Sequence, residues 1–563
     1  MAKFKETVDK YASHTALAYL SDDEYKKISY KKLDIYRWRL AHFLQGQGLK
    51  KGDKIALMLN NSPEWVISDL ASASLGIIVV PIHTTFNSQY IVRVIDHSEA
   101  KYLVIQREFF DKHKSSLVSL SLKKIIIVGP SQDILSDKIV AWPNLNLVGQ
   151  EEDITVDLNA DDVHTIIYTS GTTGDSKGVM LSHANLVANV DSAKHNVPIG
   201  YKDRFFSFLP LSHAFERTAG YYAPIFSGSS IYFAKDAKSI IDNIKKARPT
   251  IINSVPRIFD KIYGKVFDKV EAGSKLKKKL FFKGLKLAVL KRKKQLNFFS
   301  RCELFFLDYL VLKKLRAILG GRLRLAISGG ASLDQKIMKF FENLGITIIE
   351  GYGMTEASPI IAVNRPGNSR VGTVGQALDC NVIKILDSKE ILLKGKNIML
   401  GYYKNSELTK ELIDKDGCLH TGDLGFMDKE GFLTIIGRAK DVIVLSTGKN
   451  IFPESLENSL NESRYISQSM VYGDNDKQLS AIIVPNFEQL KIWCDERNIA
   501  MDLKNEKILD FYDAKIKEKL NGFAKVEQIN NFKLISEEFS QENGMLTPTL
   551  KLKRYKIRDI IIV

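Results

Sequence analysis

The segment Tyr168-Thr169-Ser170-Gly171-Thr172-Thr173-Gly174-Asp175-Ser176-Lys177-Gly178 holds three glycines, a run of Ser and Thr hydroxyls and one lysine within eleven residues. Glycines leave backbone N–H groups free to point at phosphate oxygens, the hydroxyls add further donors, and Lys177 adds a positive charge. By composition alone, a run rich in Gly, Ser and Thr is most often a flexible loop. The segment therefore predicts either an ordinary loop or a phosphate-binding one.

The spacing excludes the P-loop of nucleoside triphosphatases. That motif reads G-x-x-x-x-G-K-[ST], whereas here Gly178 follows the lysine at the position where Ser or Thr would bind Mg²⁺. The context differs as well, because strand-like apolar runs precede the loop at 166–169 and follow it at 179–181, and helix signals begin only at Ser182. A loop between two strands lacks the helix N-terminus that a P-loop places against phosphate.

Strand and helix signals alternate over the first 160 residues and again at 323–350. The strand run Lys54–Leu59 is followed by Ser62-Pro63-Glu64, which is an N-cap, a first-position proline and a first-turn acid, and Gly76 is a stop signal for that helix. We expect another helix over Leu333–Leu344, capped by Ser332. Further strand runs lie at 77–80, 102–105, 125–128, 323–328 and 346–350. The alternation predicts an α/β fold in which mostly parallel sheets are covered by helices.

The pattern changes near Gly437–Lys440. Beyond this point, short strand runs at 466–472 and 479–484 mix with helical patterns. We therefore expect a large N-terminal domain over residues 1–437 and a small α+β C-terminal domain over residues 438–563.

Composition places the chain among globular proteins. Of its 563 residues, 45% are hydrophobic and 26% are charged, which excludes a disordered chain. The four cysteines form no C-x-x-C pattern, which favours a reducing compartment. The N-terminus lacks the apolar region of a signal peptide and no apolar stretch can cross a bilayer, so we expect a cytoplasmic protein. The net charge of +16 is typical of proteins that bind nucleic acid, an anionic membrane surface or acidic small molecules.

The glycine-rich segment resembles the phosphate-binding signature of the adenylate-forming enzymes, a superfamily of acyl-CoA synthetases, luciferases and peptide-synthetase adenylation domains. Further motifs of that family follow in the expected order: Pro210-Leu211-Ser212-His213, Ser328-Gly329-Gly330-Ala331, Gly351-Tyr352-Gly353-Met354-Thr355-Glu356, Thr421-Gly422-Asp423-Leu424-Gly425, Gly437-Arg438-Ala439-Lys440-Asp441 and Leu550-Lys551-Leu552. One departure is Ser176, where many members carry proline. The resemblance implies a reaction in two halves. A carboxylate attacks ATP to give an acyl-adenylate and pyrophosphate, and the thiol of coenzyme A then displaces AMP.

The resemblance also implies roles for individual residues. Lys551 would contact the α-phosphate and the attacking carboxylate, and Glu356 would bind Mg²⁺. The expected catalytic residues are Lys551, Glu356, Thr355 and His213. The residues expected to bind ATP or AMP are Thr169, Ser170, Gly171, Thr172, Thr173, Gly174, Lys177, Gly329, Gly330, Ala331, Gly351, Tyr352, Gly353, Asp423 and Arg438. In the family the C-terminal domain is mobile, which implies a hinge at Lys440, and Gly448 would contact coenzyme A.

Several of these residues also have ordinary interpretations when each is taken alone. Asp423, between glycines, is typical of an Asx-turn. Tyr352 and His213 could be core residues with satisfied hydrogen bonds, and Lys551 could be one more surface lysine. The resemblance instead implies that the Asp423 carboxylate accepts hydrogen bonds from both ribose hydroxyls of ATP and that Arg438 reaches the ribose as well.

Three features resemble the long-chain fatty acyl-CoA synthetases in particular. They are the segment Val255–Ile262, an insert at about 265–321, and the segment Leu546–Arg554, which contains the last motif in its long-chain form. The alternative within the superfamily is a fatty acyl-AMP ligase that loads a carrier protein. The insert is rich in aromatic residues, for which we expect packing against the main sheet or a place along an apolar acyl tunnel: Phe281, Phe282, Phe298, Phe299, Phe305 and Phe306.

The insert also contains a basic segment, residues 275–294, with ten Lys or Arg and no acidic residue. Because the expected substrate is a membrane-soluble acid, this segment predicts contact with an anionic membrane surface, while a solvated charged helix is the alternative. A nucleic-acid module is a different class of function. The segment contains no recognisable RNA-binding motif, and such a module would leave the glycine-rich motifs unexplained, so we expect no nucleic-acid partner.

Overall fold

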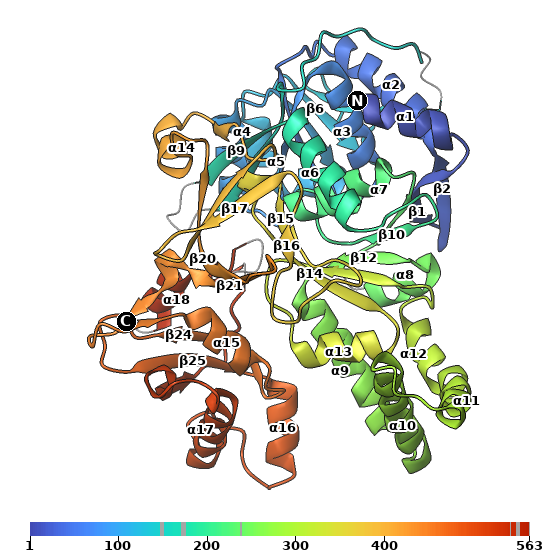
Figure 1. Ribbon diagram of the computed structural model, residues 1–563. Helices are drawn as coiled ribbons and strands as arrows, with labels where there is room; N and C mark the ends of the chain where they lie inside the picture. The colour runs from blue at the N-terminus through green and yellow to red at the C-terminus, as the bar shows by residue number, and fades with distance from the viewer. Residues whose placement is uncertain (147–150, 171–175, 237–238, 541, 548–551, 562–563) are drawn as a thin grey trace. The chain divides into compact units, whose positions relative to one another are not determined.

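The structure is a computed structural model that describes the chain except for residues 147–150, 171–175, 237–238, 541, 548–551 and 562–563 (Figure 1). The chain divides into two compact units. As far as the described residues go, the first unit comprises residues 1–382 and 393–419, and the second comprises residues 383–392 and the chain from 420 onward.

The first unit is built on two large sheets whose inner strands run parallel. In the eight-stranded sheet the order is β19 (Gly401–Tyr402), β9 (Ser176–Ser182), β8 (Val163–Ser170), β4 (Ile78–Pro81), β3 (Lys54–Met58), β5 (Tyr102–Gln106), β6 (Lys124–Val128), β7 (Ile139–Ala141). In the nine-stranded sheet the order is β16 (Gln376–Ala377), β15 (Ile360–Val363), β14 (Thr347–Gly353), β13 (Leu325–Ser328), β12 (Ile251–Ser254), β10 (Arg204–Ser207), β11 (Ser230–Phe233), β1 (Thr15–Ser21), β2 (Glu24–Ser29). Antiparallel pairs occur where β9 meets β8 and β19, where β15 meets β14 and β16, and where β1 meets β2.

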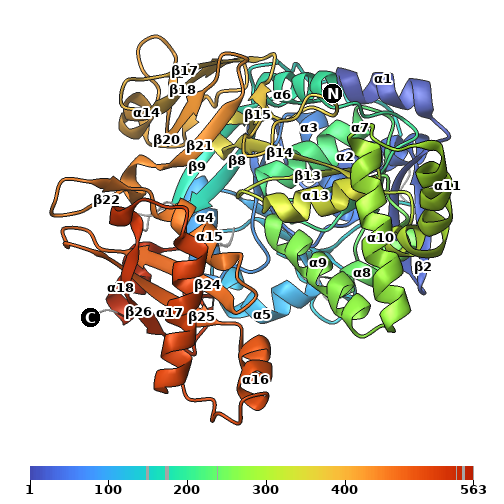
Figure 2. The same ribbon diagram turned by 60° about the horizontal axis from the view of Figure 1, so that its bottom comes forward.

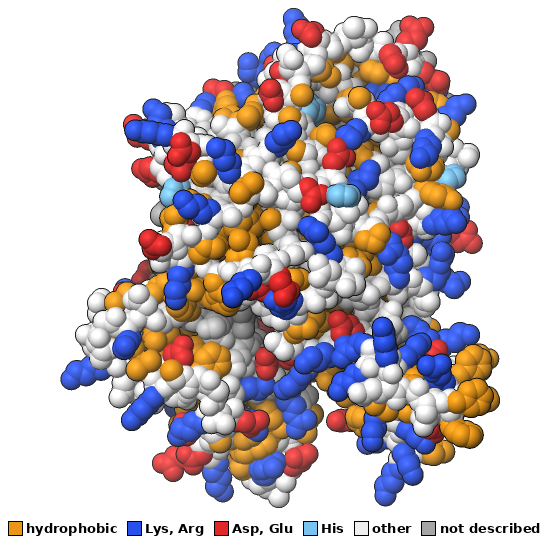
Figure 3. Space-filling model, viewed as in Figure 1, with side chains coloured by type: hydrophobic (Ala, Val, Ile, Leu, Met, Phe, Trp, Pro, Cys, Tyr) orange, Lys and Arg blue, Asp and Glu red, His pale blue; other side chains and the backbone are white. Residues whose placement is uncertain are grey.

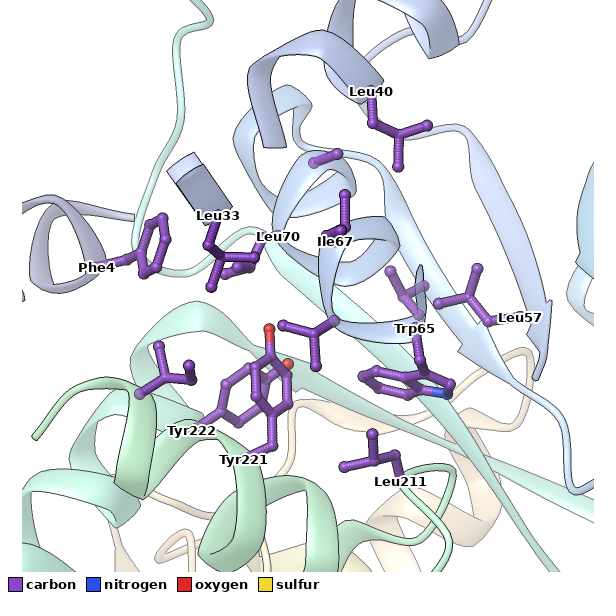
Figure 4. Packing of buried hydrophobic residues seen from close by; sticks show 14 of the residues in the cluster. Phe4, Leu33, Leu40, Leu57, Trp65, Ile67, Leu70, Leu211, Tyr221 and Tyr222 are labelled. Atoms are coloured by element: carbon purple, nitrogen blue, oxygen red, sulfur yellow. The ribbon is translucent and has the colours of Figure 1, made fainter. Parts of the chain in front are cut away.

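Helices cover these sheets and fill the space between them. The helices of the first unit are α1 (Ala2–Tyr11), α2 (Tyr30–Gly46), α3 (Pro63–Leu75), α4 (Ser88–Ser98), α5 (Arg107–Val118), α6 (His183–Asn196), the π-helix η1 (Glu216–Tyr222), α7 (Ala223–Ile225), α8 (Ile240–Ala247), α9 (Pro256–Glu271), α10 (Lys275–Arg292), α11 (Phe298–Leu307), the π-helix η2 (Asp308–Leu312), α12 (Lys313–Ile318), α13 (Gln335–Asn343), the 3-10 turn η3 (Thr355–Ala357) and α14 (Ser406–Leu412). The largest core cluster joins side chains of both sheets to α2, α3 and η1, with Trp65 and Tyr221 fully buried in it (Figure 4).

The helix predicted after Ser62 is confirmed. The Ser62 hydroxyl accepts a hydrogen bond from the Trp65 backbone N–H at 3.4 Å, and Gly76 ends α3 in the left-handed conformation with φ of +68°. The helix predicted at 333–344 is shorter than expected, and the predicted cap was wrong. Glu350 accepts the Leu333 N–H at 2.9 Å, so that group does not enter the helix, and Asp334 caps α13 instead.

A second core cluster lies on the other face of the nine-stranded sheet. Figure 2 shows α9, α10 and α11 side by side, next to α8 and α13. Of the six insert phenylalanines expected to pack against the sheet or line a tunnel, Phe281 is buried in this cluster. The other five are more than half exposed, so the expected packing against the main sheet was wrong for them.

The second unit is a smaller α+β assembly, which holds residues 383–392 and 420–437 in addition to the segment from 438 onward that the change of pattern pointed to. Its strands form a four-stranded sheet of β17 (Asn381–Ile385), β18 (Glu390–Gly395), β20 (Leu419–Met427) and β21 (Leu433–Arg438), a hairpin of β22 (Ile443–Val444) and β23 (Asn450–Ile451), and a three-stranded sheet of β24 (Ile466–Tyr472), β25 (Leu479–Pro485) and β26 (Ile529–Leu534). Its helical elements are η4 (Ala439–Asp441), α15 (Pro453–Asn461), α16 (Phe487–Asp495), α17 (Glu506–Leu520), η5 (Lys525–Glu527) and α18 (Arg554–Ile561). Both faces of the three-stranded sheet carry buried apolar clusters.

Within the described part of the chain, no helix is both long enough and apolar enough to span a bilayer.

Candidate active site

The glycine-rich segment forms a hairpin between two strands, as predicted. Strands β8 and β9 pair antiparallel, with Thr169 opposite Lys177 and Ser170 opposite Ser176, and helix α6 begins only after the capping residue Ser182. The tip of the hairpin, residues 171–175, lies outside the described residues. The predicted ATP contacts of Gly171, Thr172, Thr173 and Gly174 therefore stay predictions.

The base of this hairpin is packed closely. A Cβ atom at Gly178 would lie 2.8 Å from Ile166 and 3.2 Å from the ring of Tyr168, so only glycine fits there. The hydroxyl of Tyr168 lies 2.7 Å from Nδ1 of His97, which fixes the ring. These contacts hold the two strands rigidly where they enter the predicted phosphate-binding loop.

Lys177 and Glu356 are brought together by a residue that the sequence did not point out, Tyr402. Strand β19 pairs with β9 and places the Tyr402 ring beneath the Lys177 ammonium, with 5.6 Å between Nζ and the ring centroid. The Tyr402 hydroxyl donates a hydrogen bond of 2.8 Å to Glu356 Oε1. Burial raises the pKa of Tyr402 well above its ordinary value, so the hydroxyl stays protonated and remains a donor.

The short turn that carries Thr355 and Glu356 is anchored from three neighbouring elements. Asn397 donates to the Ala357 carbonyl at 2.6 Å, and Asn189 of α6 donates to the Ile360 carbonyl at 2.7 Å. Thr218 of η1 donates to the Ser358 carbonyl at 3.1 Å. Because three main-chain carbonyls that follow Glu356 closely are held, the turn fixes the backbone from which its carboxylate projects.

The donor set at Glu356 suits a magnesium ion that is shared with a nucleotide. Among the described residues no group of three or more His, Cys, Asp or Glu side chains could hold a metal. Mg²⁺ in nucleotide enzymes typically keeps one or two carboxylates and completes its shell with phosphate oxygens and water. A carboxylate has acceptor capacity for several partners, so Glu356 can hold a cation while it accepts the Tyr402 hydroxyl.

Two of the glycines expected to bind ATP or AMP are explained by contacts within the protein. A Cβ atom at Gly329 would lie 3.2 Å from the ring of Phe215, and one at Gly353 would lie 2.0 Å from the carbonyl oxygen of Pro359. Gly330 has φ of +86°, which suits glycine in the turn after β13. Gly351 and Tyr352 belong to β14, where the Tyr352 side chain is half-buried rather than part of the core, and Ala331 is exposed.

His213 lies beside a second histidine that the sequence did not point out. The ring centroids of His213 and His83 are 6.2 Å apart, and His83 Nδ1 lies 3.0 Å from the Ser212 hydroxyl. Burial, together with the neighbouring His213 charge, lowers the pKa of His83 to about 3. His83 is therefore neutral at physiological pH.

The π-helix η1, which follows His213 directly, is fixed by a buried ionic network. Arg217 pairs with Asp69 of α3, and both side chains are 1% exposed. The hydroxyls of Tyr221 and Tyr222 also donate to Asp69, at 3.0 and 2.7 Å, and Figure 4 shows both rings beneath α3. Burial alone would raise the pKa of Asp69, but the charges of Arg217 and His164 outweigh it and hold the pKa below its usual range. The signal in the sequence was the adjacent charged pair Glu216-Arg217 inside an otherwise apolar run.

Glu216 is buried in the same helix without a cationic partner among the described residues. Its Oε2 accepts from Asn253 at 3.4 Å, and its carboxyl group fills the space that a Cβ atom at Gly220 would need. Burial raises the pKa of Glu216 to about 8, only partly offset by hydrogen bonds from Ser207 and Asn253. The side chain is therefore mostly protonated at neutral pH.

We expect Glu216→Gln to change how stability depends on pH. Because the folded-state pKa is raised, the protonated form stabilises the fold fully below about pH 4.5, and this contribution is lost as pH rises through about 8. The variant cannot lose this contribution. Between pH 5 and pH 9 the wild type should therefore lose roughly 3–5 kcal/mol of its free energy of unfolding that the variant keeps. Denaturant titrations of both proteins at the two pH values measure this difference. An equal pH dependence in both would contradict the buried, protonated state.

In the second unit, Asp423 and Arg438 come together across two strands. They are directly opposite in the β20–β21 pair, and Arg438 Nε lies 2.9 Å from Asp423 Oδ1. Thr421 supports the turn, since its hydroxyl donates to the Ile391 carbonyl at 2.8 Å and accepts from the Asp423 N–H at 3.1 Å. The two predicted ribose ligands therefore form one charged pair on a rigid hairpin.

The remaining predicted residues of the C-terminal region lie outside regular strands and helices or outside the described residues. Lys440 is exposed in the short turn η4 that follows β21. Gly448 closes the β22–β23 hairpin with φ of +76°, and its N–H donates to the Leu445 carbonyl at 2.8 Å. Lys551 lies outside the described residues.

Comparison with known families gives two matches along the chain. A family model described as AMP-binding enzyme matches residues 4–403, and one described as AMP-binding enzyme C-terminal domain matches residues 440–516.

Curated relatives match most of the chain. The peroxisomal long chain acyl-CoA synthetase 6 of Arabidopsis thaliana is 31% identical, over 95% of this chain and 80% of the relative. The long-chain-fatty-acid–CoA ligase FadD15 of Mycobacterium tuberculosis is 32% identical, over 91% and 87%. The rat long-chain-fatty-acid–CoA ligase 5 is 32% identical, over 95% and 83%.

Solved structures share the fold at lower identity. ATP-bound MatB from Rhodopseudomonas palustris superposes with a TM-score of 0.73 at 23% identity, covering 99% of this chain and 98% of the other. The O-succinylbenzoate coenzyme A synthetase MenE from Bacillus subtilis, in complex with ATP and magnesium, gives 0.71 at 21% identity, covering 99% of both chains.

Proposed function

Because the chain belongs to the AMP-binding enzymes and is a long-chain fatty acid–CoA ligase of that family, we propose that Lys177, Tyr402 and Glu356 form the phosphate end of its ATP site. The enzyme activates a long-chain fatty acid as its acyl-adenylate and transfers the acyl group to coenzyme A, releasing pyrophosphate and AMP. The observation that carries the proposal is the hydrogen-bonded bridge from Glu356 to Tyr402, whose ring faces the Lys177 ammonium.

Catalysis of adenylation depends mainly on positioning of the carboxylate and ATP and on positive charge around the α-phosphorus. We assign the phosphates to the hairpin residues Thr169 and Ser170, to the loop 171–174 and to Lys177. The adenine lies against Gly329–Ala331 and Gly351–Gly353, with Tyr352 on one face. Mg²⁺, when bound, neutralises triphosphate charge, and Glu356 beside Thr355 is the residue that would hold it. His213 lies at the acyl and phosphate side.

The ribose and the mobile part of the cycle belong to the second unit. Asp423 accepts hydrogen bonds from the ribose hydroxyls, and Arg438 orients that carboxylate at 2.9 Å. Lys440, in the exposed turn that follows the last strand of the four-stranded sheet, is the hinge. The domains on its two sides are 1–437 and 438–563, so Asp423 belongs to the second compact unit but precedes the hinge. Lys551 supplies charge to the α-phosphate, and Gly448, at its hairpin tip, contacts coenzyme A.

The location is the finer part of the proposal, and the acceptor can be tested directly. Coenzyme A as acceptor follows the names of the curated relatives, whereas a fatty acyl-AMP ligase would load a carrier protein instead. Pyrophosphate release from acids between acetate and oleate, measured with and without coenzyme A, separates the two. The enzyme works in the cytoplasm, and the basic segment 275–294 attaches it peripherally to an anionic membrane surface, since exposed Lys and Arg residues attract anionic headgroups.

We expect Tyr402→Phe to weaken the response to magnesium more than the maximal rate. Without the hydroxyl, Glu356 loses the hydrogen bond that orients Oε1, so the Mg²⁺ concentration for half-maximal pyrophosphate release should rise several-fold. Glu356→Gln removes the negative charge itself, so it should lower the maximal rate of pyrophosphate release by about 10²-fold. Tyr403→Phe is the matched control, because its hydroxyl donates to Glu99 at 2.8 Å instead.

The readout must include binding as well as turnover. Mn²⁺ binding in the presence of a non-hydrolysable ATP analogue, followed by electron paramagnetic resonance, reports on the cation directly. If Tyr402→Phe and Tyr403→Phe show the same cation affinity, Tyr402 does not position Glu356.

A further inference from the structure

Helix α11 carries apolar side chains on two sides. Leu304 and Leu307 point inward and are 7% and 4% exposed in the core cluster under the nine-stranded sheet. The outward side is apolar as well, with exposed fractions between 50% and 81%. We call it the aromatic face, and it consists of Phe298, Phe299, Phe305, Phe306, Tyr309 and Leu310.

The spacing makes these residues one continuous surface. Pairs of apolar residues recur seven to eight and then eleven to twelve positions after Phe298, which places them on one side of a helix. Solvent-facing sides of helices are normally polar, and isolated exposed apolar residues are common, but a contiguous patch marks a site of interaction. Cys302 is exposed as well, between the two phenylalanine pairs in the sequence.

Positive charge surrounds the aromatic face. Residues 275–316 contain fourteen Lys or Arg and two acidic residues, which gives +12 of the net +16 of the chain. Both acids are paired within the unit, Glu303 with Lys283 and Asp308 with Arg316. Figure 3 shows orange side chains on the outer edge of the lobe that holds α10 and α11, with blue side chains around them. The basic residues that are exposed in this region are Lys275, Lys277, Lys279, Lys283, Lys286, Lys291, Arg292, Lys293, Lys294, Arg301, Lys313 and Lys314.

The exposed aromatic face and the positive charge around it together favour one class of binding partner over the others. Protein–protein interfaces are depleted in lysine, and a second copy of this chain would bring a second strongly positive surface against the first. A bilayer with anionic headgroups satisfies both features, because phenylalanine and leucine side chains enter the boundary between headgroups and acyl chains while lysines contact phosphate oxygens.

We propose that the aromatic face of α11 and η2 inserts into the interfacial layer of an anionic membrane, with the exposed lysines of α10 at the level of the headgroups. The inference rests on the proposed peripheral attachment and extends it from electrostatic contact to insertion. Insertion has a consequence that charge alone lacks, because part of the binding survives high salt, where surface electrostatics are screened.

The test is co-sedimentation of the full chain with vesicles of phosphatidylcholine alone or with 30% phosphatidylglycerol. We expect binding to the anionic vesicles that falls in 0.5 M salt but does not vanish. Replacing Phe298, Phe299, Phe305 and Phe306 by Ser should lower the partition coefficient at least tenfold and abolish the salt-resistant part. The variant Lys291→Glu/Lys293→Glu/Lys294→Glu should instead remove the preference for anionic lipid.

A matched control replaces four exposed apolar residues elsewhere and should bind as the wild type does. It combines Val118→Ser, Leu135→Ser, Ile492→Ser and Met501→Ser. A second measurement does not depend on the folding of a multiple variant. An environment-sensitive fluorophore on the exposed thiol of Cys302, with Cys380 and Cys418 replaced by Ser, should shift to the blue with anionic vesicles.

The possible results distinguish failure of membrane insertion from failure of the proposed ligase activity. Equal binding by the Phe→Ser variant and the wild type, or no spectral shift at Cys302, overturns insertion even if electrostatic attachment remains. A lipid-free sedimentation coefficient that falls in the Phe→Ser variant shows self-association through this face and also overturns it. Thioester formation from oleate delivered on albumin should be unchanged in every variant, and its absence in the wild type would instead contradict the proposed ligase.

Discussion

Lys551→Ala is expected to lower the rate of acyl-adenylate formation by about 10²–10³, equivalent to roughly 3–4 kcal/mol of transition-state stabilisation. The physical reason is the loss of one preorganised positive charge at the phosphoryl group, where negative charge builds up as the carboxylate attacks. Attack by the thiol of coenzyme A on the mixed anhydride does not build up that charge. The variant should therefore still convert supplied acyl-AMP and coenzyme A into thioester.

The complementary variant is Lys440→Pro, in which φ is fixed near −65° at the proposed hinge. It should form adenylate at close to the normal rate and complete the thioester poorly, because the backbone rotation is blocked. Pyrophosphate release measures the first half-reaction, and thioester formation from supplied acyl-AMP measures the second. Lys553→Ala, two residues beyond Lys551, is the matched control and should affect neither strongly. Equal loss of both half-reactions in a folded Lys551→Ala protein would refute the assignment of Lys551 to adenylation alone.

Arg217→Met is expected to destabilise the first unit by about 3–5 kcal/mol. The substitution leaves the Asp69 carboxylate 1% exposed and without its guanidinium partner, and the cost comes from that uncompensated buried charge. The double variant Asp69→Leu/Arg217→Met removes both charges together and should be clearly more stable than the single variant. The measurement is the shift in the first unfolding transition in denaturant.

Arg37 provides a control for this prediction. It pairs with Asp34 at 2.6 Å, but that carboxylate is 14% exposed and sits three residues away on the same helix. Water can partly replace the lost partner, so Arg37→Met should cost less than Arg217→Met. If the two variants cost the same, burial of Asp69 is not what makes its pair important.

Local signals along the chain were enough to predict the fold class and several individual elements. The N-cap, proline and glycine around α3 act over neighbouring residues, and the structure shows each of them in place. The two strands around the glycine-rich loop were also predictable from their apolar runs, and a loop between two strands excludes a P-loop. The family resemblance, carried by short motifs in a fixed order, is confirmed by relatives that match more than nine-tenths of the chain.

Some site residues could not be predicted because they are defined by distances between remote segments. Tyr402 matters through a 2.8 Å contact with Glu356, 46 residues earlier, and nothing in a lone Gly-Tyr dipeptide indicates that contact. Asp69 and Arg217 are 148 residues apart, and their sequence positions do not reveal that each is the other's buried partner.

The insert shows most clearly how a prediction from sequence can differ from the tertiary structure. The sequence showed that residues 275–316 are basic and rich in phenylalanine and that residues 275–294 could form a helix, because composition and spacing are local properties. Aromatic residues are most often buried, so the sequence predicted burial for them. The tertiary structure decided otherwise, since the inner side of α11 packs on α10 with Leu304 and Leu307, which share a core cluster with Phe281 and Leu287. A helix has only one side that can face its own core, so the phenylalanines on the opposite side of α11 remain exposed.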